Sequence, residues 1–494
     1  MSNHLVLRCG KGWFKGAKTF FLSASVMIAG LACSSPQLGP WHSENLTEEF
    51  TAAKAEEIRT FEDYRRLEDA LFQELDEKVY AQTPTGPEYA LARYSAGSTV
   101  DPRDNDPDWN RSFEMPAEEA VGGVLLLHGM TDSPYTLRTL GRALNARGYW
   151  VVGLRLPGHG TAPSGLRTVT WPDMVAAARL AALHIESQVE GKPLHVVGYS
   201  TGAALALNLA LDALDGDGVP VPASLVLISP AIGVHPAAAL AGLKSGLAAL
   251  PGLGDLAWLQ IVPEFDPYKY NSFATNAGAI VHFATRSVAQ RVRERSKAYP
   301  SDVLPPILAL KSTVDATVSN SAVIDRLLGR LAPNRHELVL FDINRFAVKS
   351  KLMVSDPGAF TDQVMADETL PFAVTFITNE NPKSTKVVAR MKPPFSAEAP
   401  DATPLNLAWP DGVLSLSHVA LPIPPDDPLY GQRPPDNDDI LFLGQMAFQG
   451  ERGLLQFPAD WLLRLRHNPF YDYLELRAIA WIDDATRQTH LQRP

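Results

Sequence analysis

An apolar run at residues 194–199 leads directly into a Gly-x-Ser-x-Gly turn at residues 198–202, and small apolar residues follow it to residue 210. This order predicts a buried strand, a sharp turn and a helix packed behind the turn. The turn would hold the hydroxyl of Ser200 clear of the sheet, where both a base and an acyl carbonyl can reach it. Gly198 and Gly202 leave space for a tight backbone at this point. Ser200 is therefore the candidate nucleophile.

Short apolar runs and helical segments alternate from residue 122 onward, which predicts a mostly parallel sheet with helices on both faces. We expect strands at residues 124–128, 150–156, 194–199, 225–229, 307–311 and 337–341. We expect helices at residues 134–146, 171–187, 201–214 and 319–331. Ligands bind at the carboxyl ends of the strands in such a sheet, so the site should lie there.

A serine nucleophile needs a histidine base and an acid that orients the histidine, and here the expected chain order is serine, acid, histidine. Asp315 follows the expected strand 307–311, so we predict that it is the acid rather than a turn or helix-capping aspartate. His336 is the next histidine, but it begins the strand 337–341 and should lie at the opposite end of the sheet. A strand of about six residues spans roughly 20 Å, too far for a hydrogen-bonded relay. We therefore predict that His418 is the base. The alternative is that His418 only forms hydrogen bonds within its own loop.

The expected strand 124–128 ends in His128 and Gly129, ahead of a helix. In a serine hydrolase the loop at this place donates one backbone N–H to the oxyanion, and the residue after the nucleophile donates another. We assign these roles to the main-chain amides of Met130 and Thr201. His128 precedes Ser200, against the expected order, so we interpret it as a residue that shapes the loop.

His128 and Gly129, the Leu-Pro-Gly-His-Gly segment at residues 156–160, the turn at residues 198–202 and Asp315 together resemble the α/β-hydrolase superfamily. The resemblance is to its branch of monoacylglycerol lipases, carboxylesterases and serine aminopeptidases, and it covers residues 122–341 and the surroundings of His418. It implies hydrolysis of carboxylic esters, such as acylglycerols or other medium-chain esters, through an acyl-serine intermediate and without a cofactor. His159 is then a structural residue.

Two alternatives remain beside ester hydrolysis. The aminopeptidase-like relatives leave cleavage of amides or peptides open. The fold could also serve an envelope lipoprotein as a binding scaffold, because a fold by itself does not settle function.

Composition excludes some partners. The chain has 494 residues, of which 46% are hydrophobic, and a formal charge of −11. This negative charge, without a run of Lys and Arg in the body, argues against a nucleic-acid partner. The 12 histidines include no His-x-x-x-His pair, and both cysteines, Cys9 and Cys33, lie near the start of the chain, so we expect no metal site.

The first 33 residues predict an export signal. A basic start is followed by an apolar run at residues 20–32 that is too short for a transmembrane helix. The run ends in Gly-Leu-Ala-Cys at Cys33, which resembles the lipobox of bacterial lipoproteins. The resemblance implies a lipid on Cys33 and attachment to a membrane of a bacterial cell envelope. A periplasmic or secreted protein and an uncleaved anchor are the alternatives.

We divide the chain into the signal at residues 1–33, a helical extension and linker at residues 34–115, and an α/β-hydrolase domain at residues 116–494. Residues 231–303 are predicted to form a lid, with a small apolar segment at residues 237–250. Its aromatic residues would either line an acyl pocket or only pack on the sheet edge; they are Trp258, Phe265, Tyr268, Tyr270 and Phe273. Residues 342–411 are predicted to be an insertion ahead of His418.

Overall fold

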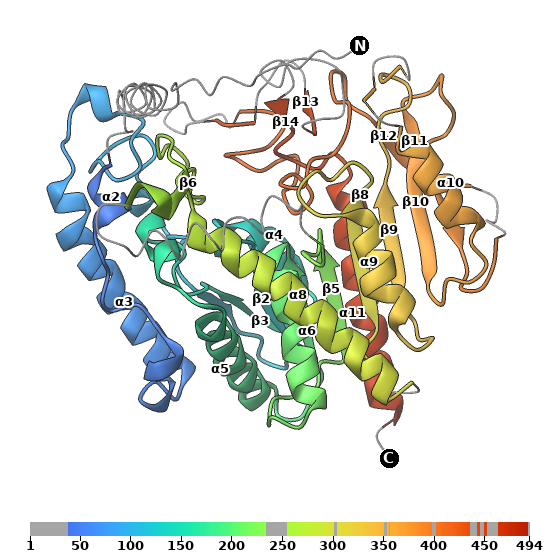
Figure 1. The fold of residues 1–494 in the computed structure, drawn as a ribbon, viewed down its shortest axis with the longest axis horizontal. Helices are drawn as coiled ribbons and strands as arrows, with labels where there is room; N and C mark the ends of the chain where they lie inside the picture. The colour runs from blue at the N-terminus through green and yellow to red at the C-terminus, as the bar shows by residue number, and fades with distance from the viewer. Residues whose placement is uncertain are drawn as a thin grey trace, which may run out of the picture. The chain divides into compact units, whose positions relative to one another are not determined.

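The described part of the chain contains a ten-stranded sheet with helices packed beside it (Figure 1). The computed structural model describes residues 38–233, 254–300, 304–349, 353–354, 356–397, 402–434, 442–444, 449–451 and 463–492. The strands of the sheet are β1 (Phe113–Met115), β2 (Gly122–Leu127), β3 (Tyr149–Leu154), β4 (Leu194–Tyr199), β5 (Ser224–Ile228), β8 (Ile307–Ser312), β9 (Glu337–Phe341), β10 (Ala373–Asn379), β11 (Lys386–Lys392) and β12 (Thr403–Ala408). Short strands pair outside it: β6 (Trp258–Gln260) with β7 (Phe273–Ala274), and β13 (Gln449–Gly450) with β14 (Leu463–Arg464). The α-helices in the same residues are α2 (Pro40–Ser43), α3 (Phe61–Lys78), α4 (Arg138–Asn145), α5 (Trp171–Val189), α6 (Thr201–Leu214), α8 (Thr275–Ala298), α9 (Asn320–Arg326), α10 (Gly358–Ala366) and α11 (Tyr471–Gln492).

The strand order is β1-β3-β2-β4-β5-β8-β9-β10-β11-β12. All neighbours from β3 to β10 pair in parallel, whereas β1 at one edge and β11 and β12 at the other pair antiparallel. The predicted mostly parallel sheet is thus confirmed. The six expected strands are β2, β3, β4, β5, β8 and β9, and each of their ends lies within two residues of its expected position.

The segment 342–411 extends the sheet beyond β9, which we did not predict from the sequence. Its strand β10 pairs in parallel with β9, with Val374 opposite Leu338 and Phe376 opposite Leu340. Strands β11 and β12 then continue the sheet as antiparallel neighbours. The run from Val374 to Ile377 is β-branched and aromatic, which is the composition typical of strands. The segment we predicted as an insertion therefore carries three of the sheet's strands.

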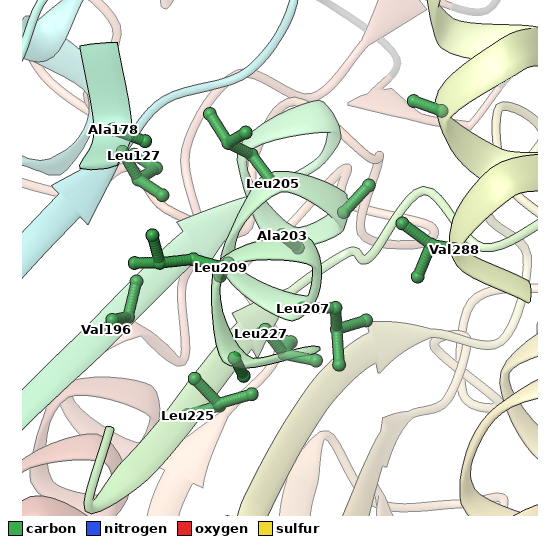
Figure 2. Packing of buried hydrophobic residues seen from close by; sticks show 14 of the residues in the cluster. Leu127, Ala178, Val196, Ala203, Leu205, Leu207, Leu209, Leu225, Leu227 and Val288 are labelled. Carbon is green, nitrogen blue, oxygen red and sulfur yellow. The ribbon is translucent and has the colours of Figure 1, made fainter. Parts of the chain in front are cut away.

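Successive residues of the central strands point to opposite faces, and each face has its own helices. Leu125, Leu127, Val196 and Leu227 pack in one apolar cluster with α5, α6 and α8. Val124, Leu126, Val197 and Val226 pack in another with α4 and α11. Figure 2 shows Leu205 and Leu209 of α6 beside Leu127 and Val196, with Val288 of α8 on the other side of the helix. Sheet and helices thus enclose α6, whose first residue, Thr201, directly follows Ser200.

Helix α11 joins the C-terminal part of the chain to the sheet. The hydroxyl of Thr486 lies 2.9 Å from Nε2 of His195 on β4 and 2.9 Å from the hydroxyl of Tyr149 on β3. Tyr149 also donates to Asp483 at 2.9 Å. These polar contacts, two of them buried, fix α11 across the central strands, on the face opposite α6.

The extension before the sheet contains one long helix, α3, which begins with a capping box between Thr60 and Asp63. Phe50, Phe61 and Leu71 are buried, and Ile58 and Leu67 are partly buried against the core. Ion pairs with Arg155 also hold the extension in place. Arg155, directly after β3, donates to Glu68 of α3 at 2.7 Å and to Glu49 at 3.0 Å.

Three of the aromatic residues in the predicted lid are packed rather than open. Tyr268 stacks on Tyr135 with ring centroids 4.0 Å apart, and Trp258 meets His42 edge to face at 5.0 Å. Tyr270 is also buried. The apolar segment 237–250 lies outside the described residues.

Cys33 and the expected export signal also lie outside the described residues. Within the described ranges, we find no helix that has both the length and the apolar character needed to cross a membrane.

Candidate active site

Ser200 lies in a strained turn between β4 and α6. Its φ of 54° and ψ of −114° are rare for a residue with a side chain, and strain of this kind costs about 1–3 kcal/mol. The surrounding backbone holds the turn, since the Ser200 N–H donates to the carbonyl of Ile228 at 2.9 Å. A Cβ on Gly198 would lie 2.5 Å from Cα of Ala203, and one on Gly202 would lie 2.1 Å from the carbonyl oxygen of Leu127. The glycines of the motif are therefore required by close backbone approach.

The structure brings Ser200, Asp315 and His418 together, although 218 residues separate the serine from the histidine. Nε2 of His418 lies 3.0 Å from Oγ of Ser200, and Nδ1 lies 2.9 Å from Oδ2 of Asp315. Because an ionised carboxylate only accepts hydrogen bonds, Nδ1 carries the proton and Nε2 is left to accept from the serine hydroxyl. This tautomer is the one that a general base needs.

The loop that carries His418 is fixed through its backbone. The His418 N–H donates to Oε2 of Glu451 at 2.9 Å, and Arg464 donates to the other oxygen of that carboxylate at 2.9 Å. The hydroxyl of Ser312, at the end of β8, donates to the carbonyl of Leu416 at 2.9 Å. The strand that leads to Asp315 and the loop that carries His418 are therefore joined directly.

Asp315 has hydrogen-bond donors on both carboxylate oxygens. The N–H groups of Thr317 and Val318 donate to Oδ1 at 2.8 and 3.0 Å. Nζ of Lys311, which is fully buried on β8, donates to Oδ2 at 2.8 Å. Burial by itself would raise the pKa of the Asp315 carboxyl, but its interactions with His418 and Lys311 lower that pKa well below its usual range. Asp315 is therefore ionised at neutral pH.

The loop of the predicted oxyanion donors is held by the segment before α8. The Tyr270 N–H donates to the carbonyl of Thr131 at 2.8 Å, and Nζ of Lys269 pairs with Asp132 at 2.7 Å. Thr131 has a φ of 68°, which turns the backbone sharply after Met130. Among the described residues, the amides of Met130 and Thr201 have no hydrogen-bond acceptor within the protein. Both amides remain predicted oxyanion donors.

His128 and His159 lie behind this loop and are held by backbone groups. Nδ1 of His128 donates to the carbonyl of Gly129 at 2.8 Å, and its Nε2 accepts from the N–H of Leu156 at 3.1 Å. Nδ1 of His159 donates to the carbonyl of Pro157 at 2.9 Å. Burial lowers the pKa of each imidazole to about 3, so neither carries a proton at neutral pH.

His336 is placed at the start of β9, where its Nδ1 accepts from the N–H of Ile307 at 3.1 Å. Ile307 begins β8, so this contact lies at the amino end of the strand whose other end leads to Asp315. The imidazole is buried and joins two strand starts. It does not take part in the Ser200 site.

Buried neutral histidines predict a loss of stability in acid. Burial lowers the pKa of His128, His159 and His195 to about 3, whereas an unfolded histidine titrates near 6.5. Below pH 6.5 the unfolded chain therefore binds protons that the folded chain does not, and each residue costs about 1.4 kcal/mol per pH unit until the folded pKa is reached. We expect the Tm in scanning calorimetry to fall steeply from about pH 6.5 to 5 and to stay nearly level from 7 to 8.

The variant His195→Gln removes one of these groups, so its Tm should fall less steeply over the same range. An unfolding temperature of the unchanged protein that is the same at pH 5 and pH 7 would contradict the expectation.

Lys311 and Glu451 are two residues of the site that we did not predict from the sequence. Lys311 carries a signal, because it is the one charged residue in the otherwise apolar strand that leads to Asp315 and precedes the acid by four positions. Glu451 carries none, since it lies far along the chain in a segment without a motif. In the described ranges, no group of three or more His, Cys, Asp or Glu side chains is arranged to hold a metal ion.

Residues 118–342 match the sequence model of the family described as serine aminopeptidase, S33. Among curated proteins, the chain is 35% identical over 116 residues to the thermostable monoacylglycerol lipase of Bacillus sp. strain H-257, covering 24% of this chain and 45% of that protein. It is 34% identical over 145 residues to the magnesium-chelatase 30 kDa subunit of Rhodobacter capsulatus, covering 29% and 47%. The chain thus spans about half the length of the curated relatives it matches.

Two of the solved structures that are similar to the chain are named monoacylglycerol lipase or monoglyceride lipase. The monoacylglycerol lipase of Paleococcus ferrophilus has a TM-score of 0.36 at 20% identity, covering 47% of this chain and 88% of that one. A soluble variant of monoglyceride lipase from Saccharomyces cerevisiae has a TM-score of 0.37 at 18% identity, covering 47% and 82%.

Proposed function

We propose that this chain, whose residues 118–342 match the model of the family described as serine aminopeptidase, S33, is a serine hydrolase that cleaves carboxylic esters. One observation carries the proposal: the His418 imidazole lies between Oγ of Ser200 and Oδ2 of Asp315, at 3.0 and 2.9 Å. Both distances are within the range for direct proton transfer and for a charge-assisted hydrogen bond.

The proposed reaction begins when Oγ of Ser200 attacks the ester carbonyl while Nε2 of His418 takes its proton. Asp315 stabilises the imidazolium, and the amides of Met130 and Thr201 donate to the oxyanion of the tetrahedral intermediate. His418 then gives its proton to the leaving alkoxide, which departs as an alcohol and leaves an acyl-serine. A water molecule then attacks the acyl-serine while Nε2 of His418 takes its proton. His418 gives this proton to Oγ of Ser200, which releases the acid and restores the serine.

We propose acylglycerols or similar medium-chain esters as the substrates. The support is the similarity to a protein named thermostable monoacylglycerol lipase, which is 35% identical over 116 residues. The second candidate is amide or peptide cleavage, which the description of the matched family as a serine aminopeptidase favours. The two candidates share the same nucleophile and differ in the leaving group, an alcohol or an amine.

A substrate panel separates these candidates. We expect the full chain to hydrolyse p-nitrophenyl esters and monoacylglycerols faster than aminoacyl anilides, and to react with a fluorophosphonate probe at Ser200. Ser200→Ala should lose at least about 10⁴-fold in kcat/KM and all labelling, because no other group replaces the nucleophile. The control Ser187→Ala, at an exposed serine of α5, should behave like the unchanged protein.

A preference for the anilides would favour the peptidase candidate. An unchanged protein that is folded but neither turns over substrate nor reacts with the probe would support the scaffold alternative and overturn the proposal.

A further inference from the structure

A lysine that is entirely buried lies next to the candidate acid. Lys311 is the fifth residue of β8, a strand that is otherwise built of Ile, Leu, Ala and Ser. Its side chain has no exposed surface, and its Nζ donates to Oδ2 of Asp315 and to the carbonyl of Val318, both at 2.8 Å. An ammonium group loses much of its hydration free energy on burial, so an apolar side chain would serve the core better at this position. The charge therefore calls for an explanation beyond packing.

The ammonium group and the imidazole share one oxygen. Nδ1 of His418 lies 2.9 Å from Oδ2 of Asp315, and Nζ of Lys311 lies 2.8 Å from the same atom. Oδ1 is occupied by two backbone N–H groups, so the carboxylate cannot rotate without losing donors. The positive charge of Lys311 also opposes the negative field that Asp315 exerts on the imidazole.

The other charged groups around His418 are already paired. Glu451, which accepts from the His418 backbone, forms an ion pair with Arg464 at 2.9 Å. Tyr199, the titratable neighbour on β4, donates its hydroxyl to the His418 carbonyl at 3.4 Å. Asp132, whose negative charge interacts with the Tyr199 hydroxyl, forms an ion pair with Lys269. Lys311 and Asp315 are thus the charges that act most directly on the imidazole.

We propose that Lys311 is a positioning residue for the reaction: it holds the Asp315 carboxylate in place beside Nδ1 of His418 and offsets the negative charge of that carboxylate. This inference rests on the proposed function. It predicts that the lysine sets the acid limb of the pH–rate profile, in addition to any contribution to stability.

The test compares the pH dependence of kcat/KM for a p-nitrophenyl ester in the unchanged protein and in Lys311→Met and Lys311→Arg. Without the ammonium charge, the field of Asp315 favours the protonated imidazole, so the acid limb of Lys311→Met should move upward by about one pH unit. Lys311→Arg keeps the charge, and its acid limb should stay in place. If Lys311→Met does not fold, Lys311→Gln, which is neutral but still a donor, should show the same shift.

Lys392→Met is the matched control. Lys392 on β11 is also fully buried, but it donates to backbone carbonyls, those of Val364 and Asp367, away from the triad. Its loss should lower the Tm without moving the acid limb.

An acid limb that coincides in the unchanged protein and in the neutral Lys311 variants would overturn the inference and leave Lys311 a purely structural residue. That outcome differs from failure of the proposed function, in which the unchanged protein itself would neither hydrolyse esters nor be labelled at Ser200.

Discussion

Replacing His418 with alanine is expected to lower kcat/KM for ester hydrolysis by about 10⁴- to 10⁶-fold. The hydroxyl of Ser200 is a weak nucleophile, and Nε2 of His418, at 3.0 Å, is the base within reach of it. The residual rate should come from substrate binding and the oxyanion donors alone. Steady-state kinetics on a p-nitrophenyl ester, with active sites counted by fluorophosphonate titration of the unchanged protein, measures the effect.

His336→Ala is the decisive comparison, because His336 is the histidine that follows Asp315 most closely in the chain. It is buried and accepts from the N–H of Ile307, so its loss should lower the Tm. Because His336 lies at the amino end of the strands, away from Ser200, kcat/KM per folded molecule should stay nearly unchanged. If His336→Ala abolished turnover while His418→Ala retained it, the assignment of the base would be wrong.

Gly202→Ala should disrupt the nucleophile turn, although alanine is the better helix former by about 1 kcal/mol. The added Cβ would lie 2.1 Å from the carbonyl oxygen of Leu127 and 2.5 Å from that of His128, both backbone atoms of the neighbouring strand end. We expect a loss of about 3 kcal/mol in the free energy of unfolding, measured by denaturant titration. The shift of Ser200 away from His418 should also lower kcat/KM by about 100-fold.

Gly216→Ala provides the control at the other end of α6. Gly216 has a φ of +88°, and nothing lies within 4 Å of the position of an added Cβ. Its replacement should cost about 1–2 kcal/mol from backbone conformation alone and leave kcat/KM unchanged. Equal losses of activity in the two variants would show that close approach at Gly202 is not what shapes the turn.

The candidate site divides into residues with local signals and residues without them. Ser200 has a motif, and Asp315 follows an apolar strand in the expected chain order, so both were predictable from short stretches of sequence. Residues near His418 contain no such motif, and its choice over His336 depended on a geometric argument about which end of a strand each histidine occupies. The structure places His418 within 3.0 Å of Ser200.

Contacts between distant segments were not predictable in the same way. Glu451 accepts from the backbone of His418, and Lys311 donates to Asp315, yet neither has a pattern that names its partner. Strands β10, β11 and β12 of the central sheet were missed as well, because we predicted residues 342–411 to be an insertion.

By itself, the sequence determined the six strands β2, β3, β4, β5, β8 and β9, the helices α4, α5, α6 and α9, and the sharp turn at Ser200, because periodicity and glycine spacing act over a few neighbouring residues. Only the tertiary structure decided which buried charges stand behind the triad and how far the sheet extends. Those features depend on close approach between segments up to hundreds of residues apart, and a local sequence pattern does not identify the distant partner.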